Sequence, residues 1–355
     1  MFMRKLHWVI LSFVLADQVP ADPAPVEVAF LYGGPVNAGV GWVHGHELAR
    51  QALEQQGSGQ VKTRFVEKVT TSGDAQRVLR QFARDKQQMI VGASFSFMNP
   101  IVAAAKENPN LAYLCASCYK NAPNIQNYLA ATYQGRYVAG ILAGYMSKSG
   151  IAAYIGSFPF PEVIRDVNAF QLGMRSVNPK AVLRVTWVNT WDDPQKEIEA
   201  AQLMVAQGAD VVTAHNDSAS VIIAAERAGV YSVAYGSDMS AFSSKQLTAI
   251  VQNWTPYFTQ QMNAVRSGTF KGGTYWGDVS DGVVTLAPFN PAIPAEATTK
   301  ANQALEELRQ HRSDVFAGPI RDQAGKEVVA AGITLDHSAL SGMNYFVEGV
   351  EGILQ

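Results

Sequence analysis

Short apolar runs alternate with amphipathic stretches along the chain from residue 26 onward. The apolar runs are rich in β-branched and aromatic residues, which is typical of buried strands. The stretches between them place apolar residues three or four positions apart, which is typical of helices packed on a core. We therefore predict strands at 26–33, 61–69, 88–94 and 111–117, and helices at 42–56, 74–85, 100–107 and 134–148.

The same alternation resumes after residue 150. We predict strands at 151–158, 183–190, 211–216 and 231–236, and helices at 161–177, 193–207 and 218–228. Three successive segments of the first half, beginning with EVAFLYGGPVNAGVGW, correspond in order to segments of the second, beginning with IAAYIGSFPFPEVIR. The alternation predicts parallel sheets covered on both faces, and the correspondence predicts a repeat. The predicted fold is therefore α/β, with two similar doubly wound parallel-sheet lobes joined by a hinge; the alternative is that any two such runs look alike.

The remaining segments carry the chain back and forth between the lobes. Strands are expected at 247–252, 274–279 and 283–287, helices at 255–267 and 294–312, and a hairpin turn at 323–325. We assign 26–148 and about 254–275 to the first lobe, and 149–253 and about 276–355 to the second.

Length and composition fit two globular lobes and exclude several classes of partner. A chain of 355 residues with 48% hydrophobic and 16% charged residues is long enough for two cores and is not disordered. Its 28 basic and 30 acidic residues nearly cancel, so no nucleic acid or anionic membrane is expected as a partner.

The first 24 residues read as a signal peptide. Arg4 and Lys5 precede an apolar run at 6–16, and Ala21 and Ala24 follow in a Pro-rich stretch. The run is shorter than the roughly 20 residues that a membrane-spanning helix needs. A buried first helix is the alternative. No Cys stands directly after this segment, so we expect a protein of the periplasm without a lipid anchor.

Cys115 and Cys118 are the only cysteines and form a single CxxC. One such pair cannot supply a four-thiolate zinc site. We favour inert thiols or a local disulfide over a redox function, since an exported protein meets an oxidising environment.

The loops that follow the strands contain a group of aromatic residues. In a doubly wound sheet, a ligand lies beyond the carboxyl ends of the strands, where these loops meet. The aromatic residues there are Trp42, Phe95, Phe97, Trp191 and Trp254. Two flat rings can hold a heteroaromatic base between them; the alternative is packing between the lobes.

Polar side chains occupy the same loops. Asp217 and Asp238 each follow a strand, and Asn99 comes shortly after Phe97. Carboxylates and amides can bind the N–H groups of a base or the hydroxyls of a ribose. Their alternative role is capping of the following helices.

No catalytic, cofactor or metal motif is apparent. The GVG at 39–41 lacks the third glycine of a dinucleotide fingerprint, and there is no P-loop. His44 and His46 are two residues apart and would lie on different faces of a helix, which disfavours a metal pair. We therefore expect a binding protein and not an enzyme.

Several segments together resemble the basic membrane protein (BMP) family of ABC-transporter substrate-binding proteins, which are purine and nucleoside receptors with a type I periplasmic-binding (Venus-flytrap) fold. The resemblance runs from residue 26 to about 352. The segments are GPVNAGVGW, SFSFMNP, CYKNAPNIQNY, GRYVAGILAG, FPFPEVIR, VNTWDDPQKE, HNDS, GSDMSAF and YWGDVSDGVVTLAPFNP.

The resemblance implies a purine stacked between Trp42 and Trp191, with Phe97 beside them. It further implies that Asn99 contacts the ring edge, that Asp217 faces the ligand and that Asp238 holds a ribose. The implied protein is a monomer that closes on its ligand and delivers it to an ABC permease in the inner membrane.

The sequence departs from the family in three ways. It has no lipobox cysteine, an Asn stands at position 99 where an Asp is usual, and the first loop lacks a double Asp. A free base such as adenine is therefore as compatible as a nucleoside. A nucleoside-metabolising enzyme and a ligand-sensing receptor on the same fold remain as alternatives.

Overall fold

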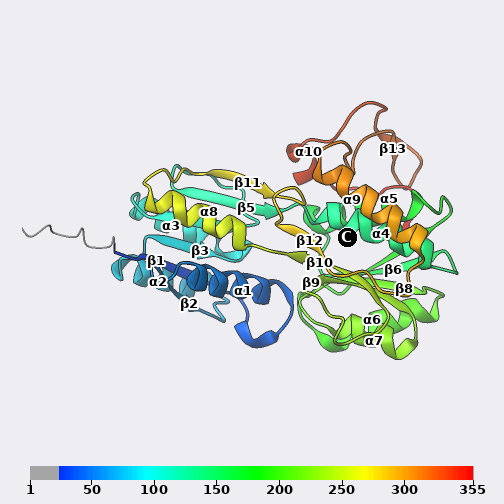
Figure 1. The fold of residues 1–355 in the computed structure, drawn as a ribbon, viewed down its shortest axis with the longest axis horizontal. Helices are drawn as coiled ribbons and strands as arrows, with labels where there is room; N and C mark the ends of the chain where they lie inside the picture. Colours follow the sequence, from blue (N-terminus) through cyan, green and yellow to red (C-terminus); the bar gives the residue numbers. More distant parts are fainter. Residues whose placement is uncertain (1–23, 355) are drawn as a thin grey trace, which may run out of the picture.

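The computed structural model describes residues 24–354. The predicted signal peptide, residues 1–24, lies outside the described residues except for its last position. Two lobes lie end to end along the longest axis of the molecule (Figure 1). Among the described residues, no helix is both long and apolar enough to cross a membrane.

The first lobe is built on a six-stranded sheet in the order β11-β5-β4-β3-β1-β2, with every pair parallel. Its strands are β1 (Val26–Leu31), β2 (Val61–Val66), β3 (Met89–Gly92), β4 (Ala112–Ala116), β5 (Ile125–Ala130) and β11 (Gly273–Gly277). Its helices are α1 (Gly41–Gln56), α2 (Ser72–Arg84), α3 (Met98–Glu107) and α8 (Thr255–Arg266), with short 3-10 turns at Val36–Ala38 and Phe95–Phe97. Helices α1 and α8 cover one face of the sheet, and α2 and α3 cover the other.

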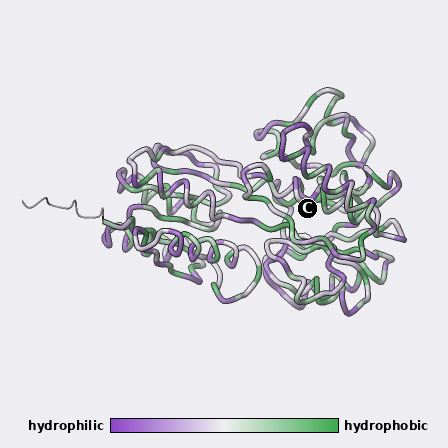
Figure 2. Tube along the Cα trace, viewed as in Figure 1, coloured by the Kyte–Doolittle hydropathy of each residue, from purple (hydrophilic) through white to green (hydrophobic). Residues whose placement is uncertain are grey.

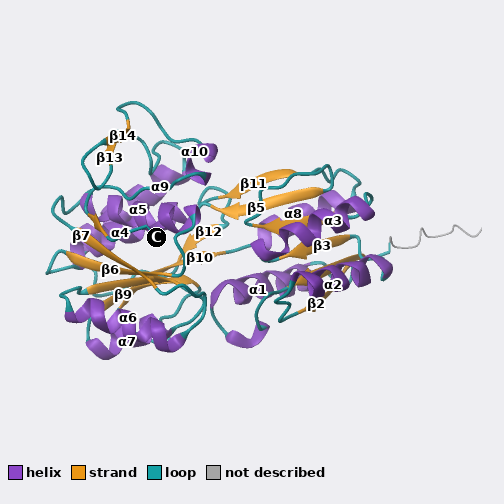
Figure 3. Ribbon diagram, turned by 180° about the vertical axis from the view of Figure 1, so that it is seen from behind, coloured by secondary structure: helices purple, strands orange, loops and turns teal. Residues whose placement is uncertain are grey.

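The second lobe is built on a seven-stranded sheet in the order β12-β10-β9-β8-β6-β7-β15. Its strands are β6 (Ile151–Gly156), β7 (Val182–Trp187), β8 (Val211–His215), β9 (Tyr231–Gly236), β10 (Gln246–Gln252), β12 (Val284–Leu286) and β15 (Val350–Glu351). Its helices are α4 (Thr132–Met146), α5 (Pro161–Arg175), α6 (Pro194–Ala206), α7 (Ser220–Ala228) and α9 (Ala295–Arg309). All neighbours are parallel except β10 and β12. Helices α6 and α7 lie on one face, and α4, α5 and α9 on the other (Figure 3).

The two sheets repeat one topology, which confirms the predicted fold. The order β2-β1-β3-β4-β5-β11 in the first lobe matches β7-β6-β8-β9-β10-β12 in the second. In each lobe, the chain order reverses beside the first strand, β1 or β6, which is where doubly wound folds bind ligands. The helices on both sheets alternate hydrophobic and hydrophilic residues, as a helix with one buried face does (Figure 2).

Helix α4 lies with the second lobe, whereas the sequence prediction grouped it with the first. Its backbone packs so closely on α5 that a Cβ at Gly140 would overlap the carbonyl oxygen of Phe170, and a Cβ at Gly173 that of Tyr137. The first crossing between the sheets therefore lies between β5 and α4, near residue 131, and not near 148.

Strand β5 was not predicted, because its sequence IQNYLA interleaves polar residues that sheet pairing on both sides accommodates. The predicted turn at 323–325 is confirmed: it joins β13 (Ile320–Arg321) to β14 (Glu327–Val329) in an antiparallel hairpin. A short helix, α10 (His337–Ser341), follows the hairpin.

Candidate ligand-binding site

The loop between β1 and α1 reaches from the first lobe to the second (Figure 1). Its residue Val40 is buried in a small apolar cluster of the second lobe with Ile222 and Met239. Directly after it, the backbone N–H of Gly41 donates to Ser237 Oγ at 3.1 Å. The N-terminus of α1 is therefore fixed against the strand ends of the opposite lobe.

Gly41 occupies a position that only glycine fits. Its φ is +84°, in the left-handed region that side chains disfavour. A Cβ there would lie 2.7 Å from the carbonyl oxygen of Asp217. The two lobes can therefore approach this closely only because Gly41 has no side chain.

Trp42, Asp217 and Trp191 are brought together at this contact. The backbone N–H of Trp42 donates to Asp217 Oδ1 at 2.9 Å, and the backbone N–H of Asp217 donates to the carbonyl oxygen of Trp191 at 2.8 Å. Asp217 is thus hydrogen-bonded to a tryptophan of each lobe, through its carboxylate to Trp42 and through its backbone N–H to Trp191. These three residues were predicted from the sequence as site residues.

The Trp42 ring is held by the core of its own lobe. Its Nε1–H donates to the carbonyl oxygen of Ala93 at 2.7 Å. The ring meets Trp254 edge to face at 6.0 Å and lies 4.5 Å from the His46 ring, centroid to centroid. Burial lowers the pKa of His46 to about 4, so this support is uncharged at neutral pH. Trp254 itself is buried behind Trp42.

The Trp191 ring is 41% exposed and belongs to an aromatic group of the second lobe. Its centroid lies 5.4 Å from that of Phe158 and 6.2 Å from that of Phe160, and the two phenylalanine rings are stacked at 5.5 Å. Neither phenylalanine was predicted as a site residue. The signal was the FPFP segment at the end of a predicted strand, where two prolines stiffen a loop that presents two rings.

Asp217 carries a perturbed charge. Burial raises the pKa of its carboxyl, the hydrogen bond from Trp42 opposes the shift and the nearby acids Asp192 and Glu197 add to it, and the resulting pKa is about 6. Within residues 24–354, no Lys, Arg or His forms an ion pair with Asp217, and no group donates to its Oδ2. The second oxygen is therefore left to accept a hydrogen bond from something else.

A buried ionic network lies under the end of β8, which leads to Asp217. Arg136 of α4 donates to Asp166 Oδ2 at 3.2 Å, to Thr213 Oγ1 at 2.7 Å and to the carbonyl oxygen of Ala214 at 2.8 Å. Burial and the nearby arginines hold the pKa of His215, next to this network, well below its usual range. Helix α4 thereby fixes the strand end that presents the site.

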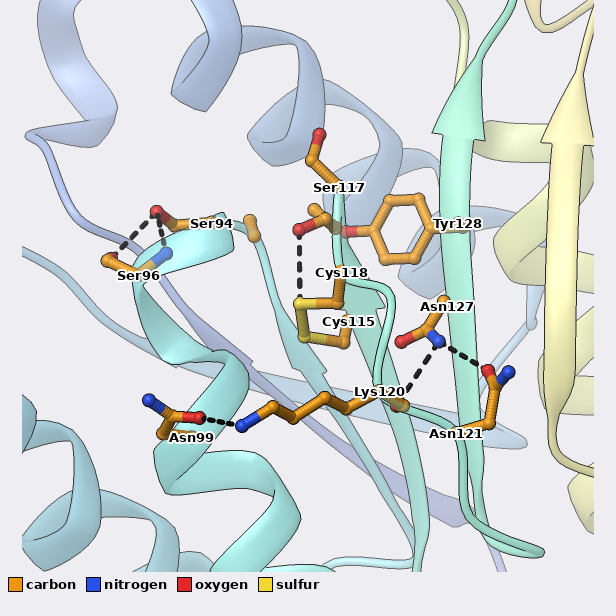
Figure 4. The surroundings of a disulfide bond; sticks show 12 residues. Ser94, Ser96, Asn99, Cys115, Ser117, Cys118, Lys120, Asn121, Asn127 and Tyr128 are labelled. Carbon is orange, nitrogen blue, oxygen red and sulfur yellow. Dashed lines mark hydrogen bonds between the residues drawn. A yellow bond between two sulfur atoms is a disulfide. The ribbon is translucent and has the colours of Figure 1, made fainter. Parts of the chain in front are cut away.

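Three other predicted residues do not join this group. Phe97 is 2% exposed and packs in the core of the first lobe. Asn99 lies on the first turn of α3, where its Oδ1 accepts from Lys120 Nζ at 2.8 Å (Figure 4). The Asp238 carboxylate accepts from the backbone N–H of Ser240 and from Gln246 Nε2, so it stabilises its own loop.

Two surface hollows lie away from this region. One of about 340 Å³ is lined by α1 and α8 residues such as Leu53 and Met262, and another of about 570 Å³ lies beside α9 around Phe289 and Leu305. None of the six predicted site residues lines either hollow. In the part of the chain that the structure describes, no three His, Cys, Asp or Glu side chains lie close enough to hold a metal ion.

A family model described as ABC transporter substrate-binding protein PnrA-like matches residues 26–313. The chain belongs to the Bmp family. This confirms the resemblance found in the sequence. Among Bmp-like relatives, a purine-binding protein of Brucella abortus is 38% identical over 96% of this chain and 97% of its own length.

A second relative has a different ligand in its name. The putative ABC transporter glucose-binding protein TsgA13 of Haloferax volcanii is 31% identical over 94% of this chain and 82% of its own length. Among solved structures, an ABC transporter solute-binding protein from Conexibacter woesei is similar in fold, with a TM-score of 0.69 and 21% identity over 81% of this chain and 98% of that one.

Proposed function

We propose that this Bmp-family protein is the periplasmic receptor of an ABC importer and that it binds a purine base or purine nucleoside between its lobes. It performs no chemistry on the ligand. After closure, the two lobes together present the surface that the membrane permease recognises.

The observation that carries the proposal is the group formed by Trp42, Asp217 and Trp191. One tryptophan comes from each lobe, and both are hydrogen-bonded through their backbones to Asp217. A purine held between two such rings gains about 1–3 kcal/mol per stacked face. Because the rings belong to different lobes, that gain is available only when the lobes are closed, so ligand binding favours closure.

Asp217 supplies the polar half of recognition. A carboxylate that is partly buried without a cation favours a ligand with N–H groups, such as the ring N–H or the exocyclic amine of a purine. A ligand that leaves this acceptor unpaired loses about 1–3 kcal/mol. In this proposal, Asp217 Oδ2 accepts the hydrogen bond from the purine N–H group.

Glucose is the second candidate, because the Haloferax relative is named as a glucose-binding protein. Isothermal titration calorimetry with adenine, hypoxanthine, guanine, their nucleosides and glucose separates the two candidates. We expect at least one purine to bind at one site per chain and glucose not to bind. Binding of glucose alone would overturn the purine assignment and leave the importer role standing.

A matched pair of variants connects affinity to the site. Trp191→Ala should weaken purine binding, whereas Phe242→Ala, which removes another exposed second-lobe aromatic ring, should not.

Chromatography of a purine nucleoside incubated with the protein tests the enzyme alternative, and release of free base would support an enzyme.

A further inference from the structure

A further hydrogen bond joins the lobes at a point separate from the contact around Gly41 and Trp42. Ser117, which follows β4 in the first lobe, donates through Oγ to Glu162 Oε2 at 3.2 Å. Glu162 lies in the first turn of α5, directly after the Phe158 and Phe160 rings. The contact therefore connects a first-lobe loop to the base of the aromatic group around Trp191.

Ser117 is held in an uncommon backbone conformation. Its φ is +54°, in the left-handed region that residues other than glycine seldom adopt. A disulfide between Cys115 and Cys118 brackets it, and its own N–H donates to the carbonyl oxygen of Tyr128 at 2.9 Å. Figure 4 shows Ser117 next to the buried disulfide, on the strand-end side of it. The disulfide and the Tyr128 bond together keep the Ser117 backbone in this conformation.

Glu162 depends on Ser117 for its hydrogen bonding. Burial raises the pKa of the Glu162 carboxyl, with Asp166 adding to the rise and Arg165 opposing it. Arg165 does not pair with Glu162: it donates to the carbonyl oxygen of Leu340 at 2.9 Å and lies over the Trp276 ring. Among the described residues, Ser117 is the sole hydrogen-bond donor to the Glu162 carboxylate.

We propose that the Cys115–Cys118 disulfide is a positioning element that holds Ser117 against Glu162, and that this pair is a latch which slows ligand release from the closed form. The proposal rests on the proposed function only in that the lobes close on a ligand. A latch formed after closure acts on the dissociation rate and leaves the association rate nearly unchanged.

Stopped-flow measurement of adenine association and dissociation tests the latch. Ser117→Ala and Glu162→Ala should each raise the dissociation rate about fivefold to tenfold, as expected for loss of one ordinary hydrogen bond. The double variant should be no faster than either single variant, because both remove the same interaction. Glu162→Gln, which keeps an acceptor oxygen, should recover most of the loss.

Glu296→Ala is the matched control, because Glu296 also lies in the first turn of a helix but is remote from the lobe contact. Its dissociation rate should equal that of the wild type. Unchanged dissociation in Ser117→Ala and Glu162→Ala, or additive effects in the double variant, would overturn the latch.

The role of the disulfide is tested with the Cys115→Ala/Cys118→Ala variant and with wild-type protein treated with a dithiol reductant. The reductant passes two electrons and two protons to the disulfide and becomes a cyclic disulfide itself, leaving two thiols. Both treatments should raise adenine dissociation to the Ser117→Ala level and have no effect in a Ser117→Ala background. Wild-type dissociation after either treatment would show that the disulfide does not position the latch.

A failure of the purine assignment is distinguishable from a failure of the latch. If adenine does not bind the wild-type protein but a nucleoside or glucose does, the dissociation rates are compared with that ligand instead. Faster dissociation in Ser117→Ala and Glu162→Ala than in the wild type and Glu296→Ala supports the latch although the adenine assignment has failed, and equal rates overturn it.

Discussion

The two lobes repeat one strand order, and they support Trp42 and Trp191 in different ways. In the first lobe, Trp42 lies against a wall of buried rings and donates a hydrogen bond to Ala93, so its orientation is fixed before any ligand arrives. In the second lobe, Trp191 is 41% exposed and its nearest neighbours are other loop aromatics. In the proposed binding mode, the first tryptophan is a rigid platform for the ligand and the second is an adaptable cover.

The buried groups behind the two tryptophans also differ in chemistry. Behind Trp42 lie uncharged aromatic rings, including His46 with its lowered pKa. Behind Trp191 and Asp217 lies the buried network of Arg136 and Asp166. The same topology therefore holds uncharged aromatic rings behind the tryptophan of one lobe and an ion pair behind that of the other. Each of these two supports can be removed by its own substitution.

The largest expected effect comes from the ionic support. Arg136→Ala leaves Asp166 buried without its cation, and this should lower the free energy of unfolding by about 3–5 kcal/mol. Arg309→Ala, which removes an exposed pair with Glu306, should cost about 1 kcal/mol or less. Chemical denaturation followed by circular dichroism measures both. Equal losses in the two variants would show that the network contributes little to the second lobe.

The two tryptophans should separate affinity from stability. Trp42→Ala should weaken purine binding and also lower the free energy of unfolding by about 3 kcal/mol, because the ring packs on Trp254. Trp191→Ala should weaken binding about tenfold, as expected for one stacked face, with the melting temperature nearly unchanged. Calorimetry and thermal melting on the same samples test this. A large stability loss in Trp191→Ala would contradict the adaptable-cover interpretation.

The lobe contact itself can be broken with one methyl group. Gly41→Ala places a Cβ 2.7 Å from the carbonyl oxygen of Asp217 and should weaken ligand binding about tenfold to a hundredfold by obstructing closure. Gly39→Ala is the control: its φ is also positive, at +77°, but nothing lies within 4 Å of its Cβ position. Equal losses in both variants would attribute the effect to backbone strain alone.

The pH dependence of Asp217 tests whether the lobe contact desolvates its carboxyl. Because the folded pKa of about 6 lies above the ordinary value of 3.8, the folded protein binds more protons than the unfolded chain in this window. The contribution of the Asp217 carboxyl to the free energy of unfolding is therefore most favourable below about pH 4 and is lost as the pH rises to about 6.

Asp217→Asn keeps an acceptor for the Trp42 N–H and removes the titration. The difference in unfolding free energy between this variant and the wild type should change by about 2 kcal/mol between pH 4 and about pH 7, with the variant gaining as the pH rises. A difference that does not vary with pH would show that the carboxyl is not desolvated by the lobe contact.

The sequence predicted most elements because their apolar patterns are local. Strand β5 escaped because the polar residues in IQNYLA mask its pattern, and its stability comes from pairing with β4 and β11. The lobe membership of α4 could not be read either. It depends on glycines 140 and 173, whose contacts with α5 appear only once both helices are placed.

The candidate site shows the same limit. Trp42, Trp191 and Asp217 were predictable because each follows a recognisable strand. The sequence could not reveal that Phe97 turns into the core, or that Asp238 is already engaged by Ser240 and Gln246. The Ser117–Glu162 contact escaped because its residues are 45 positions apart and belong to different lobes.

Mass spectrometry of small molecules released by denaturing the freshly purified protein shows directly whether the protein carries a purine. We expect a purine base or nucleoside at close to one molecule per chain, reduced in the Trp191→Ala variant. A protein that releases no purine, and whose melting temperature does not rise when purines are added, would contradict it.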